Sequence, residues 1–189
     1  MAGESSRIKW IEIGYEFFCE EGPEGIQVER LARAIGLNKS GFYYYFGTPE
    51  IYLQELLNYQ SDRVDEFLAE IPRLKDFNEY LNHLLKNKET VLFHVQLSRH
   101  RHKKIFFELY NTSNKKQDSL LAPMWANFLG IENNLSLAQK YFTHLRDVFF
   151  TRVTHKNLTY DFLIGIVTEF QYIIRQIKLS ELKTESKKR

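Results

Sequence analysis

Residues 25–50 read GIQVERLARAIGLNKSGFYYYFGTPE, and this stretch decides the fold that the sequence predicts. Two short helices are expected, over 27–35 and 39–46, with a tight turn at Gly36 between them. Glycine adopts the left-handed backbone conformation without steric cost, and Asn38 is a favourable N-cap for the second helix. This pattern is typical of a helix-turn-helix motif, whose second helix lies in the major groove of DNA.

The second helix begins with residues suited to contact DNA. Lys39 offers a cation and Ser40 a small hydrogen-bonding group in its first turn. Gly41 is unexpected there, because glycine inside a helix is about 1 kcal/mol less favourable than alanine. A helix position that approaches DNA closely explains the missing side chain.

The aromatic run that follows has two interpretations. Tyr43 and Tyr44 fall outside the apolar stripe of Phe42, Tyr45 and Phe46, so their hydroxyls are able to reach phosphates. Alternatively, FYYYF is an aromatic helix that packs only within the protein. The Ala32–Gly36 turn and the two helix caps, which are in register with it, favour the DNA interpretation.

Residues 8–58 resemble the N-terminal domain of the tetracycline-repressor (TetR) family of transcription regulators. The matching residues are Phe17, Phe18, Gly22, Gly25, Val28, Leu31, Ala32, Gly36, Leu37, Lys39, Tyr43, Phe46 and Glu50. The resemblance implies a homodimer that binds a palindromic operator and a helical C-terminal domain that binds a small-molecule effector. It places Lys39, Ser40 and Gly41 near bases, and Gln27, Tyr43, Tyr44 and Thr48 at phosphates.

The sequence departs from the family pattern at three positions. Gln27 replaces a usual Thr or Ser, Glu29 a common basic residue, and Pro49 a frequent Lys. The chain has a formal net charge of +2, yet residues 1–50 hold five basic and eight acidic residues, a net charge of −3. Few phosphate-neutralising cations predict a shallow salt dependence of DNA binding.

The rest of the chain also shows helical periodicity and no sustained strand pattern. A fourth helix starts at Thr48-Pro49 and runs to Ile71, and further helices are expected near 74–88, 90–110, 115–129, 134–154 and 158–180. The predicted fold class is therefore all-α, with a three-helix DNA-binding domain at 1–48, an effector-binding and dimerisation bundle at 49–182, and a charged tail at 183–189.

Two apolar stripes near the C-terminus are wide enough for burial on two sides. They predict a four-helix dimer interface, although an ordinary intrachain core is the alternative. The residues predicted to form the interface are Tyr141, Leu145, Phe149, Leu163, Ile166, Phe170, Ile173 and Ile177.

Aromatic residues with a few polar ones between 50 and 130 suit a mostly apolar effector. The candidate lining residues are Tyr59, Phe93, Gln96, Phe107, Tyr110, Met124, Trp125 and Phe128. The basic run Arg99–Lys104 is expected to be a solvated face or turn, with attraction of an anionic effector or an acidic partner as the alternative.

The sequence favours a regulator over an enzyme. It contains no HExxH, GxSxG or P-loop motif and one cysteine, so we expect no metal and no cofactor. No apolar run approaches the length of a membrane span, and a cytoplasmic protein without membrane contact is expected. The function predicted is a DNA-binding regulator, a repressor released by a small molecule. The alternative is a ligand- or protein-binding helical dimer that has lost operator binding.

Overall fold

The computed structural model describes residues 2–186 of the chain and the side chains of residues 5–177. The described residues form helices and contain no strand, which confirms the predicted all-α fold. They divide into two compact units. The first comprises the chain up to Arg73 together with Lys86–Gln117, and the second comprises Leu74–Leu85 and the chain from Asp118 onward. None of the described helices combines the length and the hydrophobicity that a membrane span requires.

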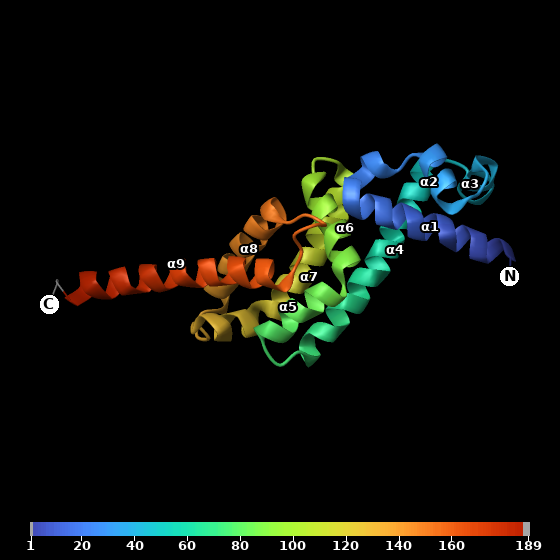
Figure 1. Ribbon diagram of the computed structural model, residues 1–189. Coiled ribbons are helices and arrows are strands. Elements are labelled where there is room, and N and C mark those ends of the chain that lie inside the picture. The colour runs from blue at the N-terminus through green and yellow to red at the C-terminus, as the bar shows by residue number, and fades with distance from the viewer. Residues whose placement is uncertain (1, 187–189) are drawn as a thin grey trace. The chain divides into compact units, whose positions relative to one another are not determined.

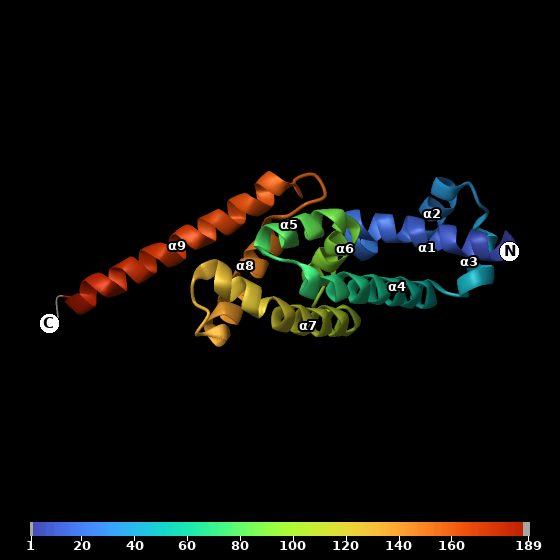
Figure 2. The same ribbon diagram turned by 90° about the horizontal axis from the view of Figure 1, so that it is seen from below.

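The first unit begins with a long helix that packs against α2, α3, α4 and α6 (Figures 1 and 2). Its elements are α1 (Ala2–Glu21), the 3-10 helix η1 (Gly22–Gly25), α2 (Val28–Ile35), α3 (Lys39–Phe46), α4 (Pro49–Glu70), η2 (Ile71–Arg73), α6 (Lys88–Arg99) and the first part of α7 (Lys104–Leu129). The predicted bounds of α3 are confirmed, and α4 starts at the predicted Pro49 and ends one residue before the predicted Ile71.

Stacked aromatic rings form the centre of the first unit. Phe93 of α6 stacks on Phe18 and on Tyr15 of α1, with ring centroids 4.0 and 4.8 Å apart. All three rings are buried, and burial of each large apolar side chain contributes about 1.5–3 kcal/mol. These contacts hold α1 against α6.

A buried polar network lies beside this aromatic stack. The Tyr15 hydroxyl donates to Gln60 Oε1, and Gln60 Nε2 donates to the Thr90 carbonyl at 3.1 Å. Arg63 Nε donates to the Thr90 hydroxyl at 3.1 Å. Burial raises the pKa of Tyr15 well above its ordinary value, so its hydroxyl stays protonated and remains a donor.

The second unit is built from α5 (Phe77–Lys86), the C-terminal part of α7, α8 (Leu135–Arg152) and α9 (Tyr160–Ser186). Trp125 is fully buried at its centre, with the Phe77 ring 4.9 Å and the Phe142 ring 5.9 Å away. Arg146 of α8 is also buried and pairs with Asp118 of α7. Burial raises the pKa of Asp118, and the Arg146 guanidinium opposes that shift.

One predicted helix boundary is wrong. The sequence predicts a break at 111–114, but α7 runs through this segment, and the break falls at 100–103, within the basic run. Asn114 is buried, and its Oδ1 accepts a hydrogen bond from His94 Nε2 at 3.0 Å. This tertiary contact holds a turn-forming residue inside a helix.

The spacing of Ile8, Ile11, Tyr15 and Phe18 predicts an apolar stripe on α1, and the last three of these side chains are buried. Ile8 is 48% exposed, whereas Trp10, which lies outside the predicted stripe, is fully buried. Trp10 packs edge-on against Phe42 of α3, with ring centroids 5.5 Å apart, so α3 selects which face of α1 is covered. The charged tail expected at 183–189 lies beyond the described side chains, and residues 187–189 lie outside the described residues altogether.

Candidate functional site

Helices α2 and α3 meet at a left-handed turn. Gly36 has φ +66°, and its amide and that of Leu37 donate to the last carbonyls of α2, those of Arg33 and Ala32. Nothing lies within 4 Å of the position that a Gly36 Cβ would occupy. Backbone conformation alone therefore requires glycine here, as the sequence predicts.

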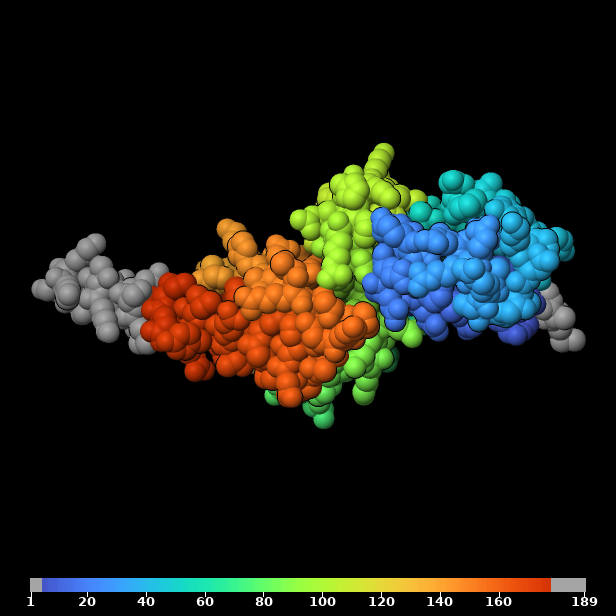
Figure 3. Space-filling model, turned by 45° about the horizontal axis from the view of Figure 1, so that its top comes forward, coloured from blue at the N-terminus to red at the C-terminus, as the bar shows by residue number. Residues whose placement is uncertain are grey.

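Buried side chains fix the angle between these helices. Leu31 and Ala32 of α2 and Phe42 and Phe46 of α3 all belong to the core of the first unit. Tyr52 of α4 closes this cluster, with its ring 4.9 Å from Phe42 and 4.8 Å from Phe46. The outer side of α2 and α3, which is light blue in Figure 3, is open on the face shown.

The first turn of α3 is capped and exposed. Asn38 Oδ1 accepts a hydrogen bond from the Ser40 amide at 3.0 Å, as expected for an N-cap. Lys39 and Ser40 are both exposed. The carbonyl of Asn38 also accepts from the Gly41 amide at 2.9 Å, so the turn is well ordered before any ligand binds.

Gly41 is not required by packing within the protein. A Cβ there would meet only Trp10 Nε1, at 3.8 Å, which is an ordinary van der Waals contact. The backbone of Gly41 is helical and has no positive φ. Alanine would therefore fit the free protein, and the absence of a side chain must have another cause.

The tyrosines of α3 divide as the DNA interpretation predicts. Tyr43 is 48% exposed and Tyr44 is 82% exposed, whereas Phe42 and Phe46 are buried. The alternative, in which the whole aromatic run packs inside the protein, is inconsistent with the exposure of Tyr44. The hydroxyls of Tyr43 and Tyr44 are thus available on the open side of the helix.

The two remaining DNA-binding candidates lie at helix starts. Gln27 occupies the N-cap position of α2 without capping it; its Nε2 donates to the Glu24 carbonyl at 3.2 Å instead. Thr48 caps α4, since its Oγ1 accepts from the Ile51 amide at 3.3 Å. Both side chains are exposed.

Carboxylates neutralise several cations near these helices. Lys39 Nζ lies 3.6 Å from Glu29 Oε1, and Arg7 pairs with Glu55 at 2.8 Å. Arg30 forms a bidentate pair with Glu21, which lowers the pKa of Glu21. Exposed pairs of this kind are individually weak, but together they reduce the positive potential offered to phosphates.

The predicted effector residues lie in different environments. In the first unit, Phe93 and Gln96 are buried, Tyr59 and Tyr110 are half-buried, and Phe107 is exposed. Gln96 Nε2 is occupied by the carbonyls of Cys19 and Glu20, at 3.2 and 3.1 Å. In the second unit, Trp125 is fully buried and Met124 is half-buried.

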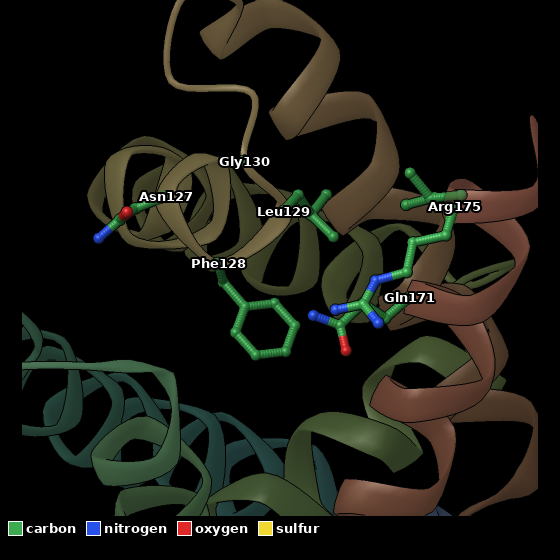
Figure 4. A pocket seen from close by; sticks show the side chains of 7 residues that line it. Asn127, Phe128, Leu129, Gly130, Gln171 and Arg175 are labelled. Carbon is green, nitrogen blue, oxygen red and sulfur yellow. The ribbon is translucent and has the colours of Figure 1, made fainter. Parts of the chain in front are cut away.

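Phe128, the last predicted effector residue, lines a cavity in the second unit. Its ring and the side chains of Gln171 and Arg175 point into the same space, as Figure 4 shows. Gln171 and Arg175 are not among the residues predicted from the sequence to bind an effector. Their signal is a polar pair four residues apart, which places both side chains on one face of α9.

The predicted dimer residues lie on α8 and α9, which pack against each other. Leu145, Leu163 and Ile166 are buried within the unit, and Tyr141, Phe149 and Phe170 are half-buried. Ile173 and Ile177 are exposed by 47% and 44%. Tyr172, which the sequence analysis did not single out, is 63% exposed next to Ile173.

The left-handed turn at Gly36 joins α2 to α3, and the first turn of α3 is exposed. Together with the packing of these two helices on α1 and α4, this arrangement defines a helix-turn-helix domain of the DNA-binding class. Residues 11–50 match the family model described as "Bacterial regulatory proteins, tetR family". This segment is therefore a tetR-family domain, and the resemblance predicted from the sequence is confirmed for it. Comparison with the curated proteins gave no match.

Solved structures of transcriptional regulators share the fold over most of the chain. A TerR/AcrR-family regulator from Aquifex aeolicus is 18% identical, with a TM-score of 0.57 over 89% of this chain and 97% of that one. A putative regulator from Saccharomonospora viridis in complex with choline is 14% identical, with a TM-score of 0.61 over 92% and 95%. The TetR-family regulator PfmR from Thermus thermophilus is 18% identical, with a TM-score of 0.53 over 88% and 97%.

Proposed function

We propose that the chain is a transcription regulator, not an enzyme, and that α3 binds the major groove of an operator. The single observation that carries this proposal is the open first turn of α3 in a matched tetR-family domain. Lys39 and Ser40 contact base edges, and Gly41 lets the helix backbone approach the groove. Packing gives no reason for glycine at 41, which supports an external one.

Four exposed side chains surround these base-reading positions and bind phosphates. Gln27 and Thr48 do so from helix starts, and Tyr43 and Tyr44 through their hydroxyls. Phosphate contacts position a protein on the duplex, whereas base contacts specify sequence. Neutral donors dominate this set, and three of the cations nearby, Arg7, Arg30 and Lys39, are paired with carboxylates.

The regulator acts as a homodimer on a palindromic site. Residues 1–48 form the DNA-binding domain, 49–182 the effector-binding and dimerisation domain, and 183–189 a charged tail. The exposed Ile173 and Ile177 of α9 support an interface built from α8 and α9. The symmetry of such a dimer matches the two-fold symmetry of a palindrome.

A small-molecule effector releases the repressor from DNA in the cytoplasm. It does so by binding the conformation that does not fit the operator more tightly than the one that does. The solved neighbour in complex with choline supports small-molecule binding by this fold. Phe128 supports a site in the second unit, because it lines a cavity there.

Electrophoretic mobility shifts on duplexes from the promoter of the gene that encodes this protein test the DNA-binding role. Tyr43→Phe is expected to weaken binding to all sequences alike, and Lys39→Ala to change the sequence preference. Tyr160→Phe is the matched control, because Tyr160 is an exposed tyrosine of α9 outside the DNA-binding domain. Equal affinities of Tyr43→Phe and wild type would remove Tyr43 from the site.

The paired cations and the net charge of −3 in residues 1–50 favour one second candidate. In it the domain has lost operator binding, and the dimer binds a ligand or a protein. Selection of binding sequences from a random duplex library at low salt separates the two. Enrichment of a palindrome supports the operator-binding regulator, and no retained DNA even at low salt supports the alternative.

A further inference from the structure

The end of α7 and the middle of α9 line a cavity of about 290 Å³ in the second unit, which is open to solvent on one side (Figure 4). The residues that line it are Asn127, Phe128 and Leu129 at the end of α7, Gly130 directly after it, and Gln171, Ile174 and Arg175 of α9. The Asn127 side chain points away from the Phe128 ring (Figure 4). Gly130 has φ +64° and ends α7 there. Its amide and that of Ile131 donate back to the helix, so the cavity rim is a fixed turn.

Arg175 differs from the other arginines described in the second unit. Arg146 pairs with Asp118, and Arg152 pairs with Glu169 at 2.6 Å. Among the described residues, Arg175 pairs with no carboxylate, and none of the residues that line the cavity is acidic. Arg175 is exposed, so its guanidinium offers N–H donors both to the cavity and to solvent, with no described carboxylate beside it.

Gln171 adds a second polar group beside this cation. It lies four residues before Arg175, so both side chains project from the same face of α9. Figure 4 shows the Gln171 amide next to the Arg175 guanidinium, both directed toward the Phe128 ring. A planar oxyanion can accept two parallel hydrogen bonds from the guanidinium and a further one from the amide.

The opposite wall is apolar and held in place. Phe128 stacks on Trp125 with ring centroids 5.3 Å apart, and the Phe77 ring lies 4.9 Å from it. Trp125 is fully buried, so this wall is part of the core and keeps its position without a ligand. An apolar group packed on Phe128 and Ile174 would be removed from water at little cost in ordering.

The cavity volume limits the size of the ligand. At about 290 Å³ the cavity lies near the lower end of the range of small-molecule sites, which suits a compact ligand. A cation would be repelled by Arg175, and a neutral apolar molecule would form no hydrogen bond with its guanidinium. A compact anion with an apolar body satisfies both walls.

We propose that this cavity binds a small organic carboxylate, with its oxygens on Arg175 and Gln171 and its apolar body on Phe128 and Ile174. The carboxylate is then the class of effector for the proposed regulator. The regulatory consequence rests on the proposed function, whereas the binding itself does not.

Isothermal titration calorimetry of the full chain with benzoate measures the affinity of the site. Benzamide and benzylamine serve as neutral and cationic probes of similar size. Benzoate is expected to bind saturably and at least tenfold more tightly than either. Arg175→Gln is expected to weaken benzoate binding at least tenfold. Arg152→Gln removes the same charge from α8 and is expected to leave it unchanged.

Equal binding of benzoate and benzamide would overturn the proposal. Equal binding of benzoate to wild type and to Arg175→Gln would overturn it as well. Absence of saturable benzoate and hexanoate binding would also overturn it. Gln171→Ala is a second variant at an accessible position, expected to weaken benzoate binding severalfold without unfolding the chain.

Titration without DNA separates this proposal from the DNA-binding role. Arg175-dependent benzoate binding in a chain that retains no duplex supports the site and contradicts the operator role. DNA binding by a chain that does not bind carboxylates contradicts the site alone. Release of bound DNA by benzoate in wild type, and not in Arg175→Gln, supports both.

Discussion

The hydroxyl of Tyr52 on α4 donates a hydrogen bond to the backbone carbonyl of Trp10 on α1. The ring reaches this carbonyl by passing over Gly14, where an added Cβ would lie 1.7 Å from the hydroxyl oxygen and 2.7 Å from Cζ. Burial raises the pKa of Tyr52 above its ordinary range, so the hydroxyl remains a donor. Tyr52 also packs on Phe42 of α3, and this contact links α1, α3 and α4.

We expect Gly14→Ala to destabilise the protein. No side chain of any size fits between α1 and Tyr52, so the ring must leave its hydrogen bond and its place against Phe42. Overpacking of a core of this kind costs about 1–3 kcal/mol. Urea unfolding followed by circular dichroism measures the loss in the free energy of unfolding.

Gly165→Ala is the matched control for that variant. Gly165 also lies inside a helix, α9, but a Cβ there meets nothing within 4 Å. Helix propensity alone then applies, and we expect stabilisation by up to about 1 kcal/mol. Similar effects of the two substitutions would contradict the close approach of Tyr52 to Gly14.

The helix-turn-helix was predictable because its determinants are local. Asn38, Gly36 and the Thr48-Pro49 pair each act on the backbone within a few residues, so the sequence alone indicates where α3 and α4 begin. The helix break near residue 100 was not predictable in this way. Asn114, a turn-forming residue at the predicted break, is instead held inside α7 by its hydrogen bond to His94 of α6, which lies twenty residues earlier in the chain.

The candidate sites differ in the same respect. The exposed DNA-facing residues follow from helical periodicity in one short segment. The cavity at Phe128 requires the end of α7 to meet the middle of α9, and no periodicity in either helix predicts that contact. Arg175 could be recognised only after the carboxylate partners of Arg146 and Arg152 were known.

We expect Gly41→Ala to separate stability from DNA binding. The Cβ fits in the free protein at 3.8 Å from Trp10, and alanine is the better helix former, so the free energy of unfolding should rise by up to about 1 kcal/mol. Against a duplex the methyl group would hold the helix away from the groove. DNA affinity should then fall about tenfold or more, which equals about 1.4 kcal/mol.

Mobility shifts and urea unfolding of the same Gly41→Ala preparation check these two effects. A variant that is more stable and binds DNA as tightly as wild type would show that the backbone of α3 does not approach the duplex closely.

Removal of the charge at Glu29 is expected to strengthen DNA binding without regard to sequence. The carboxylate lies 3.6 Å from Lys39 Nζ and competes with DNA for it, and it also repels nearby phosphates. Glu29→Gln should therefore raise affinity for palindromic and random duplexes alike at low salt. Screening should reduce the difference at high salt, because both charges are exposed.

Glu70→Gln is the control for this charge change, since Glu70 pairs with Arg73 at the far end of α4. Fluorescence anisotropy at several salt concentrations gives both affinity and salt slope. Unchanged affinity of Glu29→Gln for random duplexes would mean that Glu29 does not face DNA.

Polar substitution on the exposed face of α9 is expected to prevent dimer formation. Ile173 and Ile177 lie one turn apart and are about half exposed, so together they offer apolar surface that a second copy can cover. Two charges at these positions would remain unpaired in a close-packed interface, whereas in the monomer they would be solvated. The variant Ile173→Glu/Ile177→Glu should therefore be a folded monomer by light scattering and circular dichroism.

The control for this double variant is Thr168→Glu, which places a charge elsewhere on the exposed surface of α9 and should leave the dimer intact. A dimer of unchanged dissociation constant in the double variant would assign the interface to another face. In a folded monomer, loss of binding to a palindrome with retained weak binding to a half-site would link dimerisation to operator recognition, because two linked half-site contacts bind far more tightly than one.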